Sequence, residues 1–261
     1  MFDAASLLTD LAYGPHARQR LDVFRPAGVQ DAPVLVFFHG GGFIRGDKRD
    51  RANVGAWGAA QGFVTVLANY RLAPDHRWPS GAEDVVAVWQ FVREHATGWG
   101  GSPARIVLIG ESAGAAHVAA ATLMTRFQPE AWRIAGAALL SGPYNAGLEA
   151  QAANALGIPS PDIRNNAYFG EDSSLWAQAS TVDQVDAPPF PLLIAAAERD
   201  LLQMQVQAGE LFARLVTQQG YAPELHWWRG HDHFTPGASL GSDDSTVGGP
   251  LAAFVHRVCA A

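Results

Sequence analysis

The sequence predicts an α/β fold in which a mostly parallel central sheet is covered by helices on both faces. Apolar runs alternate along the chain with segments of helical pattern, and this alternation is typical of parallel sheets. Most of the apolar runs are continuous, as expected for strands that are covered on both faces. A chain of 261 residues can bury one large core, so we expect residues 1–261 to form a single domain.

The strands of this sheet are expected in the apolar runs. Sheets of this kind bind ligands beyond the carboxyl ends of their strands, so the residues that follow each strand are the first candidates for function. The expected strands cover residues 20–25, 34–39, 63–69, 105–110, 134–140, 191–198 and 223–228.

The helices are expected between these runs and carry recognisable end signals. Ser80, followed three residues later by Glu83, is typical of a capping box at the start of a helix. The segment after Ser112 is rich in alanine, the best helix former, and Gly220 is a residue type that commonly ends helices. These signals predict helices over residues 80–96, 112–127, 201–220 and 250–259.

The composition is that of a soluble globular protein and narrows the range of partners. The net charge is −7, so no basic surplus exists to attract the phosphates of nucleic acid or of an anionic membrane, and we expect neither partner. Cys259 is the only cysteine, which excludes an internal disulfide. The chain begins without the pattern of a secretory signal and has no run of bilayer-spanning length, so we expect a cytoplasmic location.

The segment GESAG (110–114) stands between an expected strand and an expected helix. A nucleophilic serine needs a very sharp turn there, so that its hydroxyl stands clear of the backbone, and flanking glycines let the strand and the helix approach. The motif is weak evidence by itself in a glycine-rich chain, but its position after a strand and before a helix makes it specific. Ser112 is therefore the candidate nucleophile, and the alternative is an ordinary helix N-cap.

The segment HGGGF (39–43) supports this interpretation. Attack of a serine on a carbonyl creates a negative oxygen, which backbone N–H groups stabilise when they already point at it. Glycines let these amides come close, and an HGGG-type segment has this role in lipases and esterases. Gly41 and Gly42 are the expected donors, together with Ala113 and with Gly40 as a further candidate, and we expect His39 to hold the loop in place.

A serine nucleophile needs a base, and the base needs a group that orients it. Asp200 follows an expected strand and is the preferred acid, with Glu198 as the alternative. The loop after the last expected strand offers two bases, of which we favour His233, while His231 stays a candidate for the pocket or the base. A metal ion held by these histidines and Asp232 is disfavoured, because no second cluster of ligands accompanies them, and we expect no metal and no cofactor.

The order of HGGGF, NYRLAP (69–74), GESAG, Asp200 and HDHF resembles the hormone-sensitive-lipase-like branch of the α/β-hydrolases, close to the arylformamidase-like esterases. The resemblance runs from about residue 20 to the C-terminus. It implies the α/β-hydrolase fold and carboxylesterases or lipases that act on short- to medium-chain acyl esters without metal or cofactor. Carried onto matching positions, it implies a triad of Ser112, His233 and Asp200.

The chain departs from this branch at several points. Asn69 stands where the branch typically has an acid. Residues 1–19 form only a short N-terminal cap segment, whereas members of the branch usually have a larger cap. His233 is followed directly by Phe234 rather than by a small residue, which leaves His231 open as the base.

The stretch 141–190 is too long for a simple connection, and we expect it to form a partial lid with a short helix or two. Aromatic residues in it are candidates to face the substrate, with a structural role in anchoring the lid as the alternative. The candidate pocket residues are Phe43, Tyr144, Tyr168, Phe169, Trp176 and His231.

The sequence thus predicts a serine carboxylesterase that hydrolyses short- to medium-chain esters through an acyl-enzyme intermediate. One alternative is an arylformamidase-like hydrolase that cleaves a formyl amide such as N-formylkynurenine with the same residues. A second alternative is a non-catalytic binding protein on the same fold, because a fold does not fix a function. The expected partner is a small-molecule ester, and the chain is expected to be a monomer or a homodimer.

Overall fold

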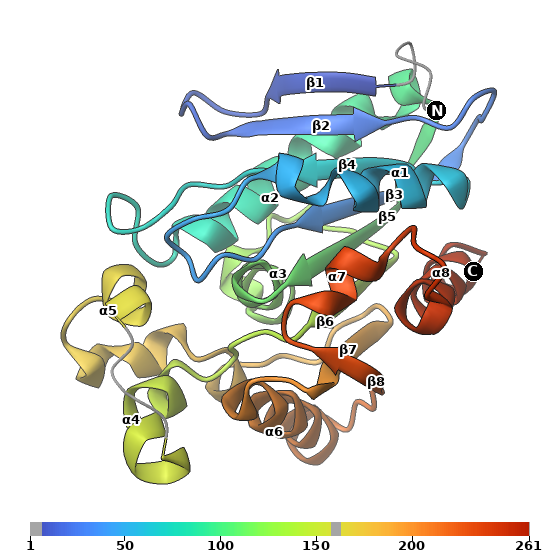
Figure 1. Cartoon of the computed structure of the whole chain (residues 1–261). Coiled ribbons are helices and arrows are strands. Elements are labelled where there is room, and N and C mark those ends of the chain that lie inside the picture. The colour runs from blue at the N-terminus through green and yellow to red at the C-terminus, as the bar shows by residue number, and fades with distance from the viewer. Residues whose placement is uncertain (1–6, 158–162, 261) are drawn as a thin grey trace.

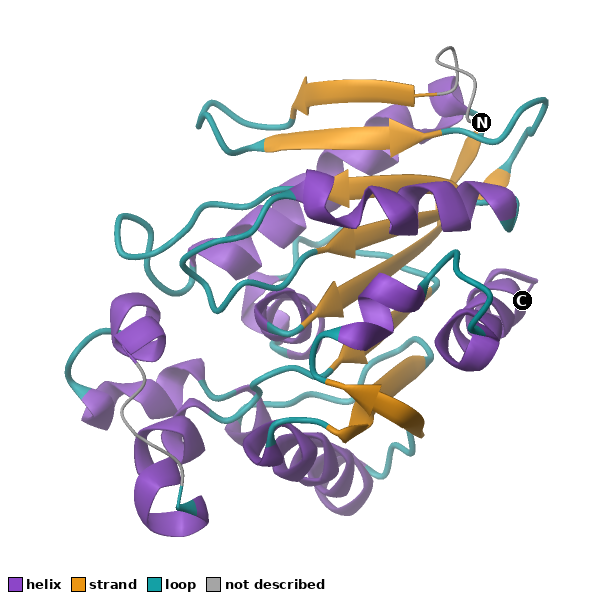
Figure 2. Ribbon diagram, viewed as in Figure 1, coloured by secondary structure: helices purple, strands orange, loops and turns teal. Residues whose placement is uncertain are grey.

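In the computed structural model of the chain, which describes residues 7–157 and 163–260, one sheet carries helices on both of its faces (Figures 1 and 2). The sheet has eight strands in the order β1-β2-β4-β3-β5-β6-β7-β8. Strand β2 pairs antiparallel with both β1 and β4, and all the other neighbours are parallel. The strands are β1 (Leu7–Ala12), β2 (Arg20–Phe24), β3 (Ala32–Phe38), β4 (Val64–Ala68), β5 (Gly101–Glu111), β6 (Gly136–Leu140), β7 (Leu192–Arg199) and β8 (Glu224–Asp232).

The helices lie between the strands, as the alternation of the sequence predicts. The α-helices are α1 (Ala52–Ala60), α2 (Ser80–His95), α3 (Ala113–Leu123), α4 (Ala146–Leu156), α5 (Ile163–Phe169), α6 (Leu202–Gln219), α7 (Thr235–Ser239) and α8 (Ser245–Ala260). Short 3₁₀ helices occur at Lys48–Arg51, Ala96–Trp99, Thr125–Phe127, Ser173–Ala179 and Thr181–Asp183. None of the helices in the described part of the chain is both long enough and apolar enough to cross a bilayer.

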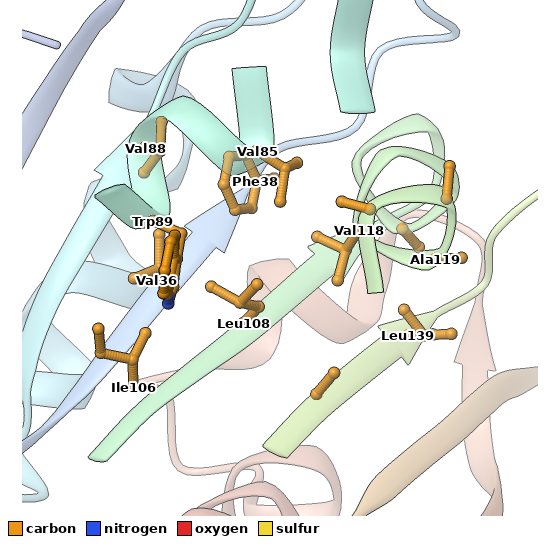
Figure 3. Close-up of a cluster of buried hydrophobic side chains, with 14 of the residues drawn as sticks. Val36, Phe38, Val85, Val88, Trp89, Ile106, Leu108, Val118, Ala119 and Leu139 are labelled. Carbon is orange, nitrogen blue, oxygen red and sulfur yellow. The ribbon is translucent and has the colours of Figure 1, made fainter. Parts of the chain in front are cut away.

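Two apolar clusters sandwich the sheet, and strand β3 shows why its sequence is continuously apolar. Val36 and Phe38 pack on the face covered by α2, α3 and α6, together with side chains of β5 and β6 (Figure 3). Leu35 and Phe37 pack on the other face, against α1 and α8. Because successive side chains of a strand point to opposite faces, a strand between two layers of helices needs apolar residues at every position.

The connection between β6 and β7 carries α4 and α5 and lies at the end of the sheet toward which the parallel strands point (Figure 1). This is the stretch 141–190 in which we expect a partial lid, and its residues 158–162 lie outside the described residues. An ideal Cβ placed on Gly42 would lie 2.7 Å from Cδ of Arg164, which belongs to α5. The connection therefore reaches the glycine loop that follows β3.

The expected strands and helices are present, but three local predictions are wrong. The sheet begins at β1, within the expected cap segment 1–19, whose first six residues lie outside the described part. The predicted capping box is absent, because Ser80 is the first helical residue and its hydroxyl donates to the carbonyl oxygen of His76, while Glu83 pairs with Arg71. Helix α8 begins at Ser245, ahead of the expected residue 250.

A buried lysine joins the edge strand β1, Leu7–Ala12, to its neighbour β2. The side chain of Lys48 is 3% exposed, and its Nζ lies 2.7 Å from Oδ1 of Asp10 and 2.8 Å from Oδ1 of Asp22. Asp10 belongs to β1 and Asp22 to β2, so one cation joins the two outer strands. Charged groups that hold an edge strand in place are not visible in an apolar pattern.

We predict that Lys48→Met destabilises the protein by about 3 kcal/mol, because it leaves the buried carboxylate of Asp22 without its counter-charge. Urea unfolding at neutral pH measures the change. Arg49→Met is the matched control, because the neighbouring Arg49 makes an exposed pair with Asp47 and should change the stability little. Equal stability of the two variants would contradict the role of Lys48.

Candidate active site

Ser112 stands on a sharp turn between β5 and α3. Its backbone has φ 53° and ψ −120°, a conformation that L-residues rarely adopt. The glycines on either side are required by close contact: a Cβ on Gly110 would lie 2.4 Å from the carbonyl oxygen of Gly114, and a Cβ on Gly114 would lie 2.2 Å from that of Phe38. The Ser112 hydroxyl makes no capping hydrogen bond to α3, so the side chain does not act as an ordinary N-cap.

The structure brings Ser112, His233 and Asp200 together from three separate turns. Ser112 Oγ lies 3.0 Å from Nε2 of His233, and Nδ1 of His233 lies 2.7 Å from Oδ1 of Asp200. Ser112 follows β5, Asp200 follows β7 and His233 follows β8, so each side chain comes from the carboxyl end of a parallel strand. The three groups form one continuous hydrogen-bonded line.

Asp200 is held as a carboxylate. Its side chain is fully buried, which by itself raises the pKa. The hydrogen bonds from His233, Ser141 and the backbone N–H of Ala197 outweigh this burial and hold the pKa of Asp200 below its usual value. Asp200 therefore stays ionised at neutral pH and accepts the Nδ1–H of His233.

The two alternatives that the sequence leaves open lie elsewhere. Glu198 is exposed, and its Oε2 accepts the backbone N–H of Gly230 rather than contacting His233. His231 is buried with Nδ1 3.1 Å from Oγ1 of Thr235 and Nε2 3.1 Å from Oγ1 of Thr246. His231 thus links the end of β8 to the start of α8. It contacts neither Ser112 nor the cleft above it, so its prediction as a pocket residue or base is wrong.

The glycine loop after β3 presents free backbone donors beside Ser112. No described residue accepts a hydrogen bond from the backbone N–H of Gly41, Gly42 or Ala113. Gly41 has φ 137°, and a Cβ there would lie 2.0 Å from the carbonyl oxygen of Arg45, so only glycine fits. Nδ1 of His39 lies 2.7 Å from the carbonyl oxygen of Gly40, so His39 braces the loop as expected.

A cleft of about 240 Å³ opens over Ser112 and His233, between the glycine loop and the 3₁₀ helix Lys48–Arg51. Its walls carry charged side chains, whereas the sequence predicts aromatic ones. Nε and Nη2 of Arg51 each donate to the carboxylate of Glu111 at 2.7 Å, so this buried charge is compensated. The remaining charged side chains and the aromatic ring at the cleft are those of Arg45, Asp50 and Phe234.

The aromatic residues expected around the pocket do not line this cleft. Phe43 and Tyr168 stack with ring centroids 4.4 Å apart, and Phe169 packs edge-on against Phe43 at 5.3 Å. Tyr144 and Trp176 belong to the β6–β7 connection and are buried. Large aromatic rings gain stability when their apolar area is removed from water, and these rings pack against one another and against buried side chains instead of facing the open cleft. Their prediction as cleft residues is corrected accordingly.

Ser141 is a site residue that the sequence analysis misses. It directly follows β6, and its hydroxyl lies 2.5 Å from Oδ2 of Asp200. Its position just after a buried apolar strand is the signal that could have identified it, because the parallel strands end at one edge of the sheet. A group of three or more histidine, cysteine or acidic side chains suited to a metal ion is absent from residues 7–157 and 163–260.

Comparison with known proteins places these features in a family. Residues 35–236 match a family model described as the alpha/beta hydrolase fold. The chain is 31% identical over 200 residues to the probable carboxylic ester hydrolase LipM of Mycobacterium tuberculosis, which covers 70% of this chain and 46% of that protein. It is 43% identical over 96 residues to the carboxylesterase NlhH of the same organism, which covers 35% of this chain and 30% of that protein. The chain thus matches less than half the length of these relatives.

Solved structures share the same architecture. Esterase B from Lactobacillus rhamnosis superposes with a TM-score of 0.80 at 16% identity, covering 97% of this chain and 85% of that one. The hyperthermophilic esterase of the archaeon Pyrobaculum calidifontis gives a TM-score of 0.74 at 21% identity, covering 92% and 79%. These likenesses confirm the predicted fold class.

Two neutral histidines lie beneath the glycine loop. Burial lowers the pKa of His39 to about 4 and that of His117 to about 3, from an ordinary value of 6.5. Nε2 of each ring has no hydrogen-bond partner among the described residues, and burial outweighs the contacts of Nδ1 with the carbonyl oxygen of Gly40 in His39 and with the hydroxyl of Tyr168 in His117. Between about pH 4 and 6.5 the unfolded chain binds more protons than the folded one, and stability falls as the pH drops through this range.

We predict that His117→Phe weakens this pH dependence, because one proton fewer is taken up on unfolding. Between pH 5 and 6 the slope of unfolding free energy against pH should fall by about 1 kcal/mol per pH unit relative to the wild type. Urea unfolding at fixed pH values measures it. Between pH 7 and 8 the two proteins should have equal slopes, and equal slopes at pH 5–6 as well would contradict a buried neutral His117.

Proposed function

The chain belongs to the alpha/beta hydrolase family, and from that premise we propose that it is a serine hydrolase that cleaves short- to medium-chain carboxylic esters. The observation that carries the proposal is the hydrogen-bonded line from Ser112 through His233 to the buried carboxylate of Asp200. The names of the relatives, a probable carboxylic ester hydrolase and a carboxylesterase, support an ester as the bond that is cleaved.

The geometry suits acyl transfer through His233. With Nδ1–H donated to the ionised Asp200, Nε2 is the unprotonated nitrogen and accepts the hydroxyl proton of Ser112. In the proposed reaction, Ser112 Oγ attacks the ester carbonyl while His233 takes its proton. His233 then gives this proton to the departing alcohol, and a water molecule, activated by the same imidazole, releases the acyl group from Ser112.

The free N–H groups of Gly41, Gly42 and Ala113 are the proposed oxyanion donors. They lie beside the nucleophile, and no described residue competes for them. Donors that are already in place stabilise the negative oxygen of the tetrahedral intermediate without reorganisation during the reaction. A strained Ser112 turn and a glycine-only loop serve no evident purpose in a mere binding protein, which favours catalysis over that alternative.

The cleft supports small esters as substrates. Its volume of about 240 Å³ fits a short ester, and Glu111 compensates the charge of Arg51 in the cleft wall. A formyl amide would fit the same space, so N-formylkynurenine is the competing substrate to test.

We predict that the wild type hydrolyses short p-nitrophenyl esters and that Ser112→Ala lowers kcat by more than about a thousandfold, because the variant has no nucleophile. The assay compares p-nitrophenyl acetate, butyrate and octanoate with N-formylkynurenine. A thermal melt of the variant establishes that it is folded.

The outcomes separate the candidate functions. Faster cleavage of the esters supports the proposed carboxylesterase, and much faster cleavage of N-formylkynurenine replaces it by the formyl-amide hydrolase. Full activity of Ser112→Ala would remove Ser112 from the mechanism. A wild type that binds these compounds but turns over none of them would support the binding protein.

We predict that Gly41→Ala lowers kcat by about a hundredfold or more, because its Cβ would displace the loop that carries the oxyanion donors. Gly62→Ala is the matched control: Gly62 also has a positive φ, but its Cβ would meet open space. Steady-state kinetics on the best ester measures both variants. Similar kcat values for the two would argue against an oxyanion role for this loop.

A further inference from the structure

Three neighbouring strands each deliver one polar side chain to the same edge of the sheet. Strand β6 lies between β5 and β7, and Ser112, Ser141 and Asp200 follow these three strands. The backbone N–H of Ser112 donates to the carbonyl oxygen of Leu140 at 2.8 Å, and that of Ser141 donates to Ala195 at 2.8 Å. The parallel register thus continues past the strand ends and fixes the relative positions of the three residues.

Ser141 completes the hydrogen bonding of the Asp200 carboxylate. Oδ1 of Asp200 accepts Nδ1–H of His233 at 2.7 Å and the backbone N–H of Leu201 at 2.8 Å. Oδ2 accepts the Ser141 hydroxyl at 2.5 Å and the backbone N–H of Ala197 at 3.0 Å. Two donors on each oxygen leave the carboxylate plane no freedom to rotate, and Ser141 is the one described side chain besides His233 that contributes.

The backbone of Ser141 is strained in a way that glycine would avoid. Its φ is 53°, the same as that of Ser112, although an L-residue in this region is destabilised relative to glycine. The side chain is buried, with 2% of the residue exposed, and it lines no part of the cleft over Ser112. A strained serine in place of a glycine indicates that the hydroxyl has a role.

We propose that Ser141 is a positioning residue: its hydroxyl fixes the orientation of the Asp200 carboxylate and, through it, that of the His233 imidazole. This inference rests on the proposed function, in which His233 is the base. Ser141 acts on the carboxylate and not on the substrate, so its loss should change kcat and leave KM nearly unchanged.

The test uses Ser141→Ala and Ser141→Gly in the full chain with a p-nitrophenyl ester. We expect both to lower kcat by about tenfold, because small misplacements of catalytic groups reduce rates by up to about a hundredfold.

Ser141→Gly separates positioning from simple stability. Glycine adopts φ 53° without strain, so this variant should melt higher than Ser141→Ala, which loses the same hydroxyl, while the kcat of both variants falls equally. Ser102→Ala is the matched control, because Ser102 is also buried and donates a hydrogen bond to an aspartate, Asp31. Ser102 lies at the start of β5, whereas Ser112 follows the end of that strand. The control variant should keep the wild-type kcat.

A readout without turnover keeps this proposal distinct from the proposed function. The proton on Nδ1 of His233, in its hydrogen bond to Asp200, should give a low-field proton NMR signal that shifts in both Ser141 variants and not in Ser102→Ala. If the wild type cleaves no ester but this signal shifts, the proposed function fails and the positioning role stands. If the signal and the kcat of Ser141→Gly both match the wild type, Ser141 does not position Asp200, and the proposal is overturned.

Discussion

The backbone turn at Ser112 is the constraint on which the rest of the site depends. A residue with φ 53° and ψ −120° stands between β5 and α3, and the strain persists only because the surroundings fix both elements. The contacts of Gly110 and Gly114 bring the helix so close to the sheet that any side chain there would clash with backbone atoms. This geometry directs the Ser112 hydroxyl away from α3, so that it contacts His233 instead of capping the helix.

Much of the fold follows from local pattern, because burial on two faces demands apolar residues in unbroken runs. Strand β3 illustrates this, with alternate residues in two separate clusters. Strand β1 was not predicted in the same way, because it is a short edge strand that is joined to β2 by the charge of Lys48, which belongs to the 3₁₀ helix Lys48–Arg51. Ser80 failed as a cap for a similar reason: the carbonyl oxygen of His76, positioned by the preceding loop, competes for its hydroxyl.

The residues of the site likewise divide into those that the sequence predicted and those that it could not. Ser112, Asp200 and His233 lie directly after strands, so sequence position and chemistry together predicted that they would meet. The aromatic residues of the β6–β7 connection could not be placed, because a tyrosine or tryptophan is equally suited to a pocket wall and to a core, and only the packing of Phe43 against Tyr168 decides between them. The choice between His231 and His233 could not be made from the sequence. It depends on Thr235 of α7 and Thr246 of α8, whose hydroxyls contact both ring nitrogens of His231.

The β6–β7 connection joins two requirements of the site in one segment. It begins at Ser141, whose hydroxyl contacts the acid, and its helix α5 places Arg164 against Gly42 in the glycine loop. The first contact is made by a residue fixed in the register of the sheet, whereas the second is made by a long side chain on an inserted helix. Changes in α5 can therefore reshape the space above the glycine loop while β6 and β7 still hold Ser141 and Asp200 in place. In the proposed hydrolase, the positioning of Asp200 and the shape of the space above the glycine loop would therefore depend on different parts of the same connection.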